Sequence, residues 1–83
     1  MLTEQQLAFL RSEPGSNRVA KAMALAGVTQ ATVAKALGLT QPYISDVARG
    51  RYRTITVQNA WKLATYFGCR IEDLFPSPRR PSD

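Results

Sequence analysis

In the middle of this 83-residue chain, three arginines lie within five residues, at Arg49, Arg51 and Arg53. No acidic residue stands between them. A guanidinium group is always charged, and its planar set of N–H donors matches the oxygens of a phosphate group. The spacing therefore predicts a clamp for phosphate groups; the alternative interpretation is a solvated basic loop.

The positive charge of the chain is concentrated around this cluster. Between Arg18 and Arg53, six basic residues stand against one acid, Asp46, which gives +5. The six are Arg18, Lys21, Lys35, Arg49, Arg51 and Arg53. The whole chain, with 11 Lys+Arg and 6 Asp+Glu, also has a net charge of +5. Such an excess in one stretch of a small chain indicates a polyanionic partner.

The composition argues against an enzyme. The chain has no histidine and one cysteine, Cys69. Histidine-based acid–base catalysis, histidine-containing zinc sites and a disulfide within the chain are therefore excluded. Only 6 acidic residues remain for carboxylate chemistry. We expect a protein that is not an enzyme and has no metal or other cofactor.

Short helices must position the basic cluster. Gly27, Gly38, Gly50 and Gly68 each follow a short run with apolar residues at helical spacing, where a helix end favours glycine. No run with the alternation of a strand is present. The pattern predicts an all-α domain of five helices, over residues 17–26, 30–37, 41–49, 57–67 and 71–75. The expected N-caps are Ser16, Thr29, Thr40 and Thr56.

The two ends of the chain differ from this domain. Residues 1–16 form an N-terminal extension in which a short helix, capped by Thr3, is expected. Its apolar side chains, at Leu2, Leu7, Phe9 and Leu10, must cover either the domain or a partner. The domain itself spans residues 17–75. Residues 76–83 are rich in proline and serine and are expected to be a disordered tail.

The hydropathy pattern predicts no contact with a membrane. Mean hydropathy is −0.21, and the longest apolar stretch, residues 22–28, is far too short to span a bilayer. Residues 1–6 carry Glu4 and no basic residue, so no signal peptide is expected. A cytoplasmic location follows as the default.

Two of the expected helices are joined by a tight turn, residues 37–40. Gly38 permits the left-handed conformation that such a turn needs. In the second of these helices, Ile44 and Val47 point to one side. The opposite face carries Pro42, Ser45, Asp46 and Arg49, and Gln41 and Tyr43 flank it. This small, polar face suits a DNA major groove, which is about 12 Å wide.

At this point the sequence resembles the Cro/XRE (lambda-repressor-like) helix-turn-helix family over residues 17–75. The elements that carry the resemblance are Gln30, Val33-Ala34, Leu37-Gly38, Thr40, Ile44-Ser45, Gly50, Leu63-Ala64, Phe67-Gly68 and Asp73-Leu74-Phe75. They occur in the order that is typical of the family. The resemblance implies a compact five-helix domain that binds DNA.

The resemblance also implies roles for individual residues. Base contacts are expected from Gln41, Pro42, Tyr43, Ser45 and Asp46. Phosphate contacts are expected from Gln30, Thr40, Arg49, Arg51 and Arg53. Pro42 cannot donate a hydrogen bond, so contact with a thymine methyl group is what remains there. Asp46 would accept from a cytosine amine or pair with Arg49. Met23 and Ala48 occupy positions where many members bury an Arg–Glu pair.

The resulting hypothesis is a sequence-specific regulator of transcription that binds double-stranded DNA. It would act as a repressor, as a homodimer on an operator, because one helix reads only a few base pairs. Residues after Val57, around Trp61, are favoured over residues 1–10 as the dimer surface. The closest alternative is an antitoxin that uses residues 1–10 to bind a toxin. Contact with polymerase, a protein-interaction module without DNA binding, and RNA binding are further alternatives.

Overall fold

The helices occur in the predicted order. The computed structural model describes residues 1–51 and 55–76, and within them the chain is helical with no strand. The helices are α1 (Glu4–Arg11), α2 (Val19–Ala26), α3 (Gln30–Leu37), α4 (Gln41–Ala48), α5 (Val57–Phe67) and α6 (Ile71–Leu74). The expectation of five helices preceded by a short N-terminal helix is confirmed. The predictions for Arg53 and for the tail beyond Pro76 lie outside the described residues.

Threonine caps begin four of the six helices. The hydroxyl oxygens of Thr3, Thr29, Thr40 and Thr56 each accept a hydrogen bond from the backbone N–H three residues further on, at 3.1–3.2 Å. At α1 the bond is reciprocal, because the Gln6 side chain accepts from the Thr3 backbone N–H at 2.9 Å. All four caps were predicted, since cap preference depends on the local sequence alone.

The start of α2 was predicted incorrectly. Ser16 was expected to cap a helix beginning at residue 17, but α2 begins at Val19. The N-cap residue is Arg18, whose side chain makes no capping hydrogen bond. One residue earlier, the Oδ1 of Asn17 accepts from the Val19 backbone N–H at 3.0 Å. Asparagine commonly makes this bond to the backbone N–H two residues further on, in a turn that precedes the helix. Asn17 also contacts α4, as described below.

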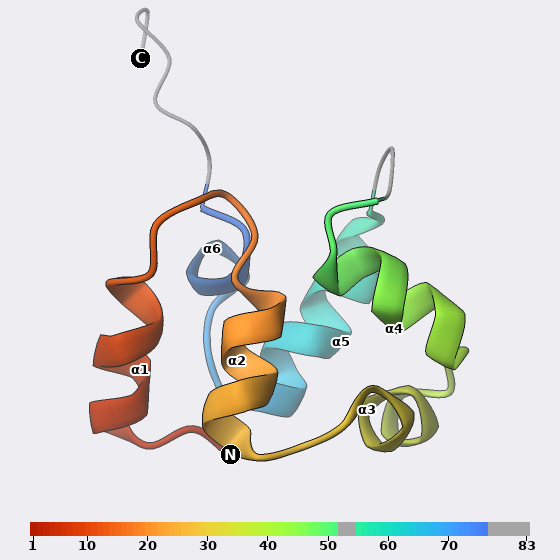
Figure 1. The fold of residues 1–83 in the computed structure, drawn as a ribbon, viewed down its shortest axis with the longest axis horizontal. Coiled ribbons are helices and arrows are strands. Elements are labelled where there is room, and N and C mark those ends of the chain that lie inside the picture. Colours follow the sequence, from red (N-terminus) through yellow and green to blue (C-terminus); the bar gives the residue numbers. More distant parts are fainter. Residues whose placement is uncertain (52–54, 77–83) are drawn as a thin grey trace, which may run out of the picture.

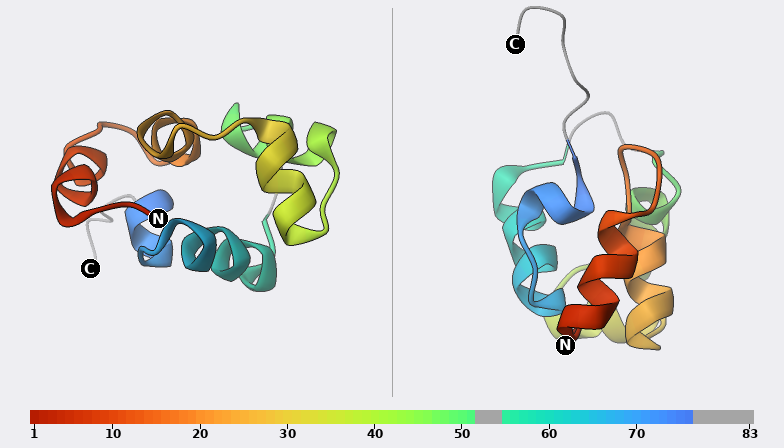
Figure 2. Two further views of the ribbon diagram at one scale, coloured as in Figure 1. Left: turned by 90° about the horizontal axis from the view of Figure 1, so that it is seen from below. Right: turned by 90° about the vertical axis from the view of Figure 1, so that its left-hand side faces the viewer.

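The helices pack in two layers around one apolar core. Figures 1 and 2 show α5 and α6 on one side, facing α1 and α2, with α3 and α4 together at one end. The largest fully buried side chain is Phe67 of α5. The core cluster also contains Leu2, Leu7, Leu10, Val19, Ala22, Met23, Val33, Ala34, Ile44, Val47, Leu63, Ala64 and Leu74. Every helix therefore contributes to a single core.

The N-terminal segment is part of this core. Leu2, Leu7 and Leu10 are buried, and the Leu2 backbone N–H donates to the Phe67 carbonyl at 3.1 Å. Figure 1 shows α1 beside α2 at the far end from α4. The leucines of this segment thus cover the domain, while Met1 and Phe9 are 70% and 55% exposed.

The longest described helix, α5, has 11 residues. Across residues 1–51 and 55–76, no helix is both long enough and apolar enough to cross a bilayer.

Candidate nucleic-acid interface

The turn between α3 and α4 fixes the angle of the two helices. Gly38 ends α3 with φ 69° and ψ 31°, a left-handed conformation that strains other residues. The Leu39 backbone N–H then donates to the Ala34 carbonyl at 2.9 Å, which closes the turn. No atom lies within 4 Å of where a Cβ of Gly38 would be, so the requirement is conformational and not one of space.

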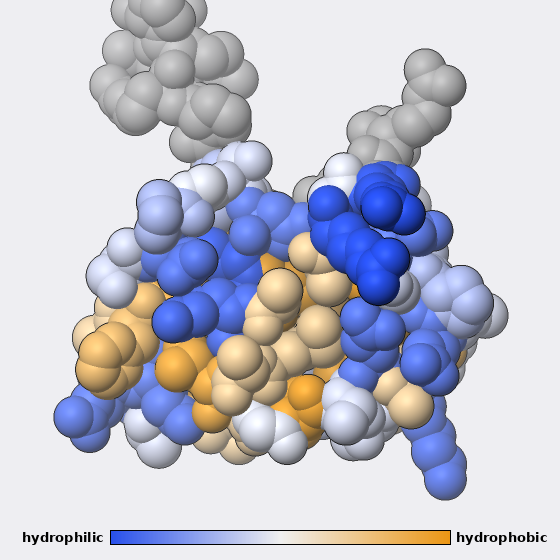
Figure 3. Space-filling view, in the orientation of Figure 1, coloured by the Kyte–Doolittle hydropathy of each residue, from blue (hydrophilic) through white to orange (hydrophobic). Residues whose placement is uncertain are grey.

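Arginines surround the C-terminal end of α4. Arg49 is the C-cap residue of α4 and Arg51 follows two residues later; both are exposed. The Arg51 backbone N–H donates to the Asp46 carbonyl at 2.8 Å, which holds the chain close to the helix end. In Figure 3 the darkest blue surface lies over this end of α4. The two described arginines of the predicted clamp are therefore available to a ligand.

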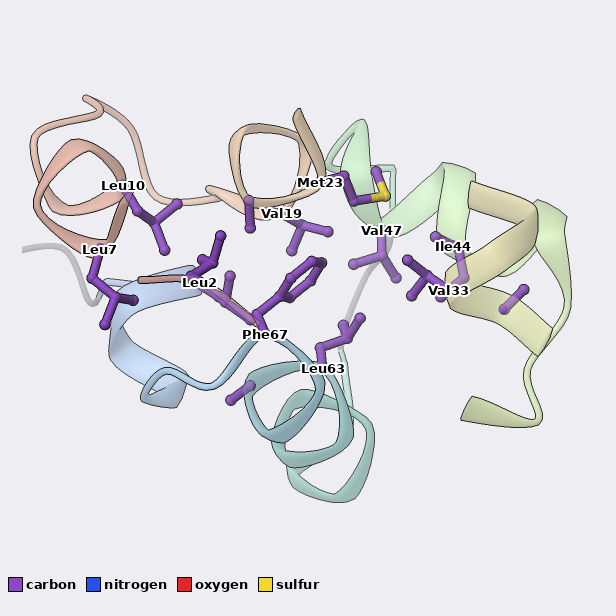
Figure 4. Packing of buried hydrophobic residues seen from close by; sticks show 14 residues of the cluster. Leu2, Leu7, Leu10, Val19, Met23, Val33, Ile44, Val47, Leu63 and Phe67 are labelled. Atoms are coloured by element: carbon purple, nitrogen blue, oxygen red, sulfur yellow. The ribbon is translucent and has the colours of Figure 1, made fainter. Parts of the chain in front are cut away.

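The inner face of α4 is apolar and completely covered. Ile44 and Val47 have no exposed surface. Figure 4 shows Ile44 beside Val33 of α3, and Val47 near Met23 of α2. Met23, at a position where many members of the resembled family bury a charged residue, is thus packed among apolar side chains, as expected.

The outer face of α4 is polar and open to solvent. Gln41, Pro42 and Asp46 are exposed, while Tyr43 and Ser45 are half-buried at its two edges. Pro42 lies in the first turn of the helix, where no backbone N–H is needed. Across residues 1–51 and 55–76 the ion pairs are Arg11–Asp73 and Lys21–Glu13, so Asp46 is not paired with Arg49. Its carboxylate can accept from an external donor.

A polar bridge joins α4 to α5. The Asn59 side chain donates from Nδ2 to the hydroxyl oxygen of Tyr43 at 2.9 Å. Asn59 was not predicted from the sequence to contribute to this site. No motif marks it, because it is one polar residue in the first turn of an amphipathic helix.

A second bridge joins the start of α2 to the end of α4. Nδ2 of Asn17 donates to the Val47 carbonyl at 2.6 Å. This carbonyl is one of the last in α4, where carbonyls lack partners within the helix, and it also accepts from the Gly50 backbone N–H at 3.1 Å. Asn17 was also missed, because the sequence places it only at the start of a helix and says nothing of a neighbour 30 residues away.

The other phosphate candidates lie at the N-terminal ends of α3 and α4. Gln30 is the first residue of α3 and is half-buried. Thr40 is exposed, and its hydroxyl oxygen accepts from the Tyr43 backbone N–H at 3.2 Å. The hydroxyl proton of Thr40 remains available to an acceptor such as a phosphate oxygen.

Two of the basic residues counted in the sequence have internal partners. Arg18 donates to the carbonyls of Glu13 and Asp73 at 2.9 and 3.3 Å. Lys21 lies 3.8 Å from the Glu13 carboxylate. Arg18 keeps its charge, but its guanidinium group is engaged within the fold, and the charge of Lys21 is partly offset by Glu13.

An ionic contact far from α4 holds the first and last helices together. Arg11 of α1 donates to both carboxylate oxygens of Asp73 in α6, at 3.0 and 3.3 Å. The guanidinium group and the Arg70 backbone N–H hold the pKa of Asp73 below its usual value, against the opposing effect of burial. Burial, together with the nearby Asp73 carboxylate, raises the pKa of the Cys69 thiol to about 11. This thiol is protonated at neutral pH and is a poor nucleophile.

Comparison with known proteins gives two matches over the same part of the chain. A helix-turn-helix family model matches residues 19–74. An uncharacterized HTH-type transcriptional regulator of Methanocaldococcus jannaschii is 36% identical over 59 residues, which cover 71% of this chain and 88% of the relative. The family match runs from the first residue of α2 to the last residue of α6. It leaves out α1 and Asn17.

Proposed function

Because the chain belongs to the helix-turn-helix family, we propose that it is a regulator of transcription that binds double-stranded DNA with sequence specificity. The observation that carries this proposal is the division of α4 into two faces. Ile44 and Val47 are completely buried, so the helix cannot rotate about its axis, and its polar face stays exposed. A rigid helix with an exposed polar face is what insertion into a major groove requires.

Base contacts are assigned to the outer face of α4. Gln41 offers a donor and an acceptor in one plane, which match the N7 and N6 atoms of adenine. Asp46, which has no ion-pair partner among the residues that the structure describes, would accept from a cytosine N4 amine. Pro42 would touch a thymine methyl group, and Ser45 would donate to or accept from a base at the edge of the face.

Phosphate contacts are assigned around both ends of this helix. Arg49 and Arg51 would bind the backbone beside its C-terminal end, and Arg53 is proposed from sequence alone. Gln30 and Thr40 would bind it beside the N-terminal ends of α3 and α4. These contacts would fix the depth and angle of α4 in the groove.

The protein would act as a homodimer that represses by occupying an operator. Two half-sites about one helical turn apart, roughly 34 Å, give the specificity that one helix lacks. Val57 and Trp61, one turn apart on α5, are 79% and 60% exposed. This exposure favours α5 as the surface that meets the second copy. The antitoxin alternative loses support, because Leu2, Leu7 and Leu10 face the core, which leaves Met1 and Phe9 as the large apolar side chains of residues 1–10 that are open to a partner.

A competition experiment tests this proposal. A fluorescent random-sequence DNA duplex is titrated with the protein at low salt, and the complex is challenged with unlabelled DNA duplex or RNA duplex of the same sequence. We expect the DNA duplex to compete better, with binding that weakens steeply as salt rises. RNA that competes better than DNA, or no binding at low salt, would overturn the proposal.

A further inference from the structure

The bridge between Asn59 and Tyr43 has a defined direction. The Asn59 amide donates and the Tyr43 hydroxyl oxygen accepts, at 2.9 Å. A tyrosine hydroxyl is both an acceptor and a donor of one proton. Since its oxygen is already engaged as an acceptor, the hydroxyl still has its proton to donate. The bond therefore leaves a donor of fixed position at the surface between α4 and α5.

This donor lies at the edge of the outer face of α4 and not at its centre. Successive residues of an α-helix are separated by about 100° around the axis. Tyr43 is thus about 100° from Pro42 and about 60° from Asp46, on the side where α5 packs. A helix in a major groove directs its central face to the base edges and its sides to the phosphates that line the groove.

Asn59 is itself held firmly. It lies in the first turn of α5, and its backbone N–H donates to the Thr56 hydroxyl at 3.1 Å. Its side chain has only two torsions between this anchored backbone and the amide that reaches Tyr43. The ring of Tyr43 is half-buried against the core, so the hydroxyl is restrained from both sides.

We propose that Asn59 is a positioning residue that holds the Tyr43 hydroxyl as a hydrogen-bond donor to a phosphate oxygen of duplex DNA. The proposal rests on the proposed function. It moves Tyr43 from the base contacts that the family resemblance implies to the phosphate contacts. It also gives α5 a part in DNA binding that does not require a side chain of α5 to touch DNA.

A double-mutant cycle tests the proposal. Tyr43→Phe, Asn59→Ala and the double variant are compared with the wild type for affinity to a preferred duplex, affinity to a random duplex, and free energy of unfolding. We expect Tyr43→Phe to weaken binding roughly tenfold on both duplexes, because a phosphate contact carries no sequence information. Asn59→Ala should weaken binding several-fold alone and have no further effect on affinity in the Tyr43→Phe background.

Two further variants separate positioning from a role in stability. Gln6→Ala removes a side-chain amide that donates to the Leu25 carbonyl, also at 2.9 Å, at the far end of the molecule. It should lower stability and leave affinity unchanged. Asn59→Asp keeps the size of the side chain, but its carboxylate accepts the Tyr43 proton, so affinity should fall at least as far as in Tyr43→Phe.

The contrary results are distinct from one another. An equal loss from Asn59→Ala in both backgrounds would show that Asn59 does not act through Tyr43. A loss from Tyr43→Phe confined to the preferred duplex would show that Tyr43 contacts a base. Unchanged affinity in Tyr43→Phe would remove the contact altogether. If the wild-type protein itself binds no duplex DNA, the proposed function fails first.

Discussion

The Nδ2 of Asn17 donates to the carbonyl of Val47 near the end of α4, at 2.6 Å, while its Oδ1 accepts from the backbone N–H of Val19 at the start of α2, at 3.0 Å. One residue thus couples the start of the matched domain to the helix that would enter the groove. The hydrogen bond from Asn59 to Tyr43 likewise ties α5 to α4, nearer the N-terminal end of α4. Two asparagines from other parts of the chain therefore set the position of α4, in addition to its apolar contacts.

Asn17→Ala should lower the free energy of unfolding by about 1–2 kcal/mol, because the Val19 backbone N–H loses its acceptor and the Val47 carbonyl keeps only backbone donors such as the Gly50 N–H. Urea denaturation measures the loss. Ser16→Ala is the matched control and should change little, since Ser16 is exposed and does not cap α2. A Ser16→Ala variant as unstable as Asn17→Ala would contradict the role assigned to the Asn17 side chain.

Gln41→Ala should cost about 1–3 kcal/mol of binding on the preferred duplex and relax the preference at one position in each half-site. Affinity measurements on a panel of single-base variants of the duplex reveal the position. Gln5→Ala, which removes an exposed glutamine on α1, serves as the control. If the wild type and Gln41→Ala show the same order of preference, Gln41 does not contact a base.

Arg49→Ala and Arg51→Ala should each weaken binding to all duplexes alike and reduce the slope of log affinity against log salt by roughly one. The same is expected of Arg53→Ala from sequence alone. Arg70→Ala removes an equal charge beside α6 and should leave the slope nearly unchanged. A double Arg49→Ala/Arg51→Ala variant with the wild-type slope would exclude the phosphate clamp.

Trp61→Glu should abolish cooperative binding to two half-sites without unfolding the domain, because the side chain is largely exposed. Phe9→Glu, on the exposed side of α1, is its counterpart and should leave cooperativity intact. Deleting residues 1–12 is not a suitable test, since it would remove Leu2, Leu7 and Leu10 from the core. Loss of cooperativity in Phe9→Glu alone would transfer the dimer surface to α1.

The Arg11–Asp73 contact should make stability depend on acid pH. The pKa of Asp73 is lower in the folded chain than in the unfolded chain. Its contribution is therefore complete above the unfolded pKa, about 3.9, and is lost as the pH falls through the folded value. Asp73→Asn should be less stable than the wild type at pH 7, and this difference should shrink below about pH 4. A constant difference in thermal midpoint from pH 7 to pH 2 would contradict this account.

Features that depend on neighbouring residues were predictable from the sequence. The threonine caps and the turn at Gly38 follow from local preferences, and the buried face of α4 follows from the spacing of Ile44 and Val47. The resemblance then supplied the outer-face candidates, three of which are exposed.

Features that depend on distant contacts were not predictable. Asn17 and Asn59 act on α4 across 30 and 16 residues, and neither distance has a signature in the sequence. The sequence also did not predict that Arg18 contacts Asp73 of α6 or that Lys21 pairs with Glu13 in the segment before α2. The sequence likewise left open what the apolar residues of α1 cover, since an amphipathic helix fits a domain and a partner equally well.

The central claim is that the outer face of α4 reads duplex DNA. Repeated selection of bound molecules from a pool of random DNA duplexes tests it most directly, with the wild type and Gln41→Ala selected in parallel. We expect the wild type to enrich an inverted repeat with half-sites about one helical turn apart, and Gln41→Ala to lose one position in each half. A pool that remains random after selection by the wild type would contradict the account.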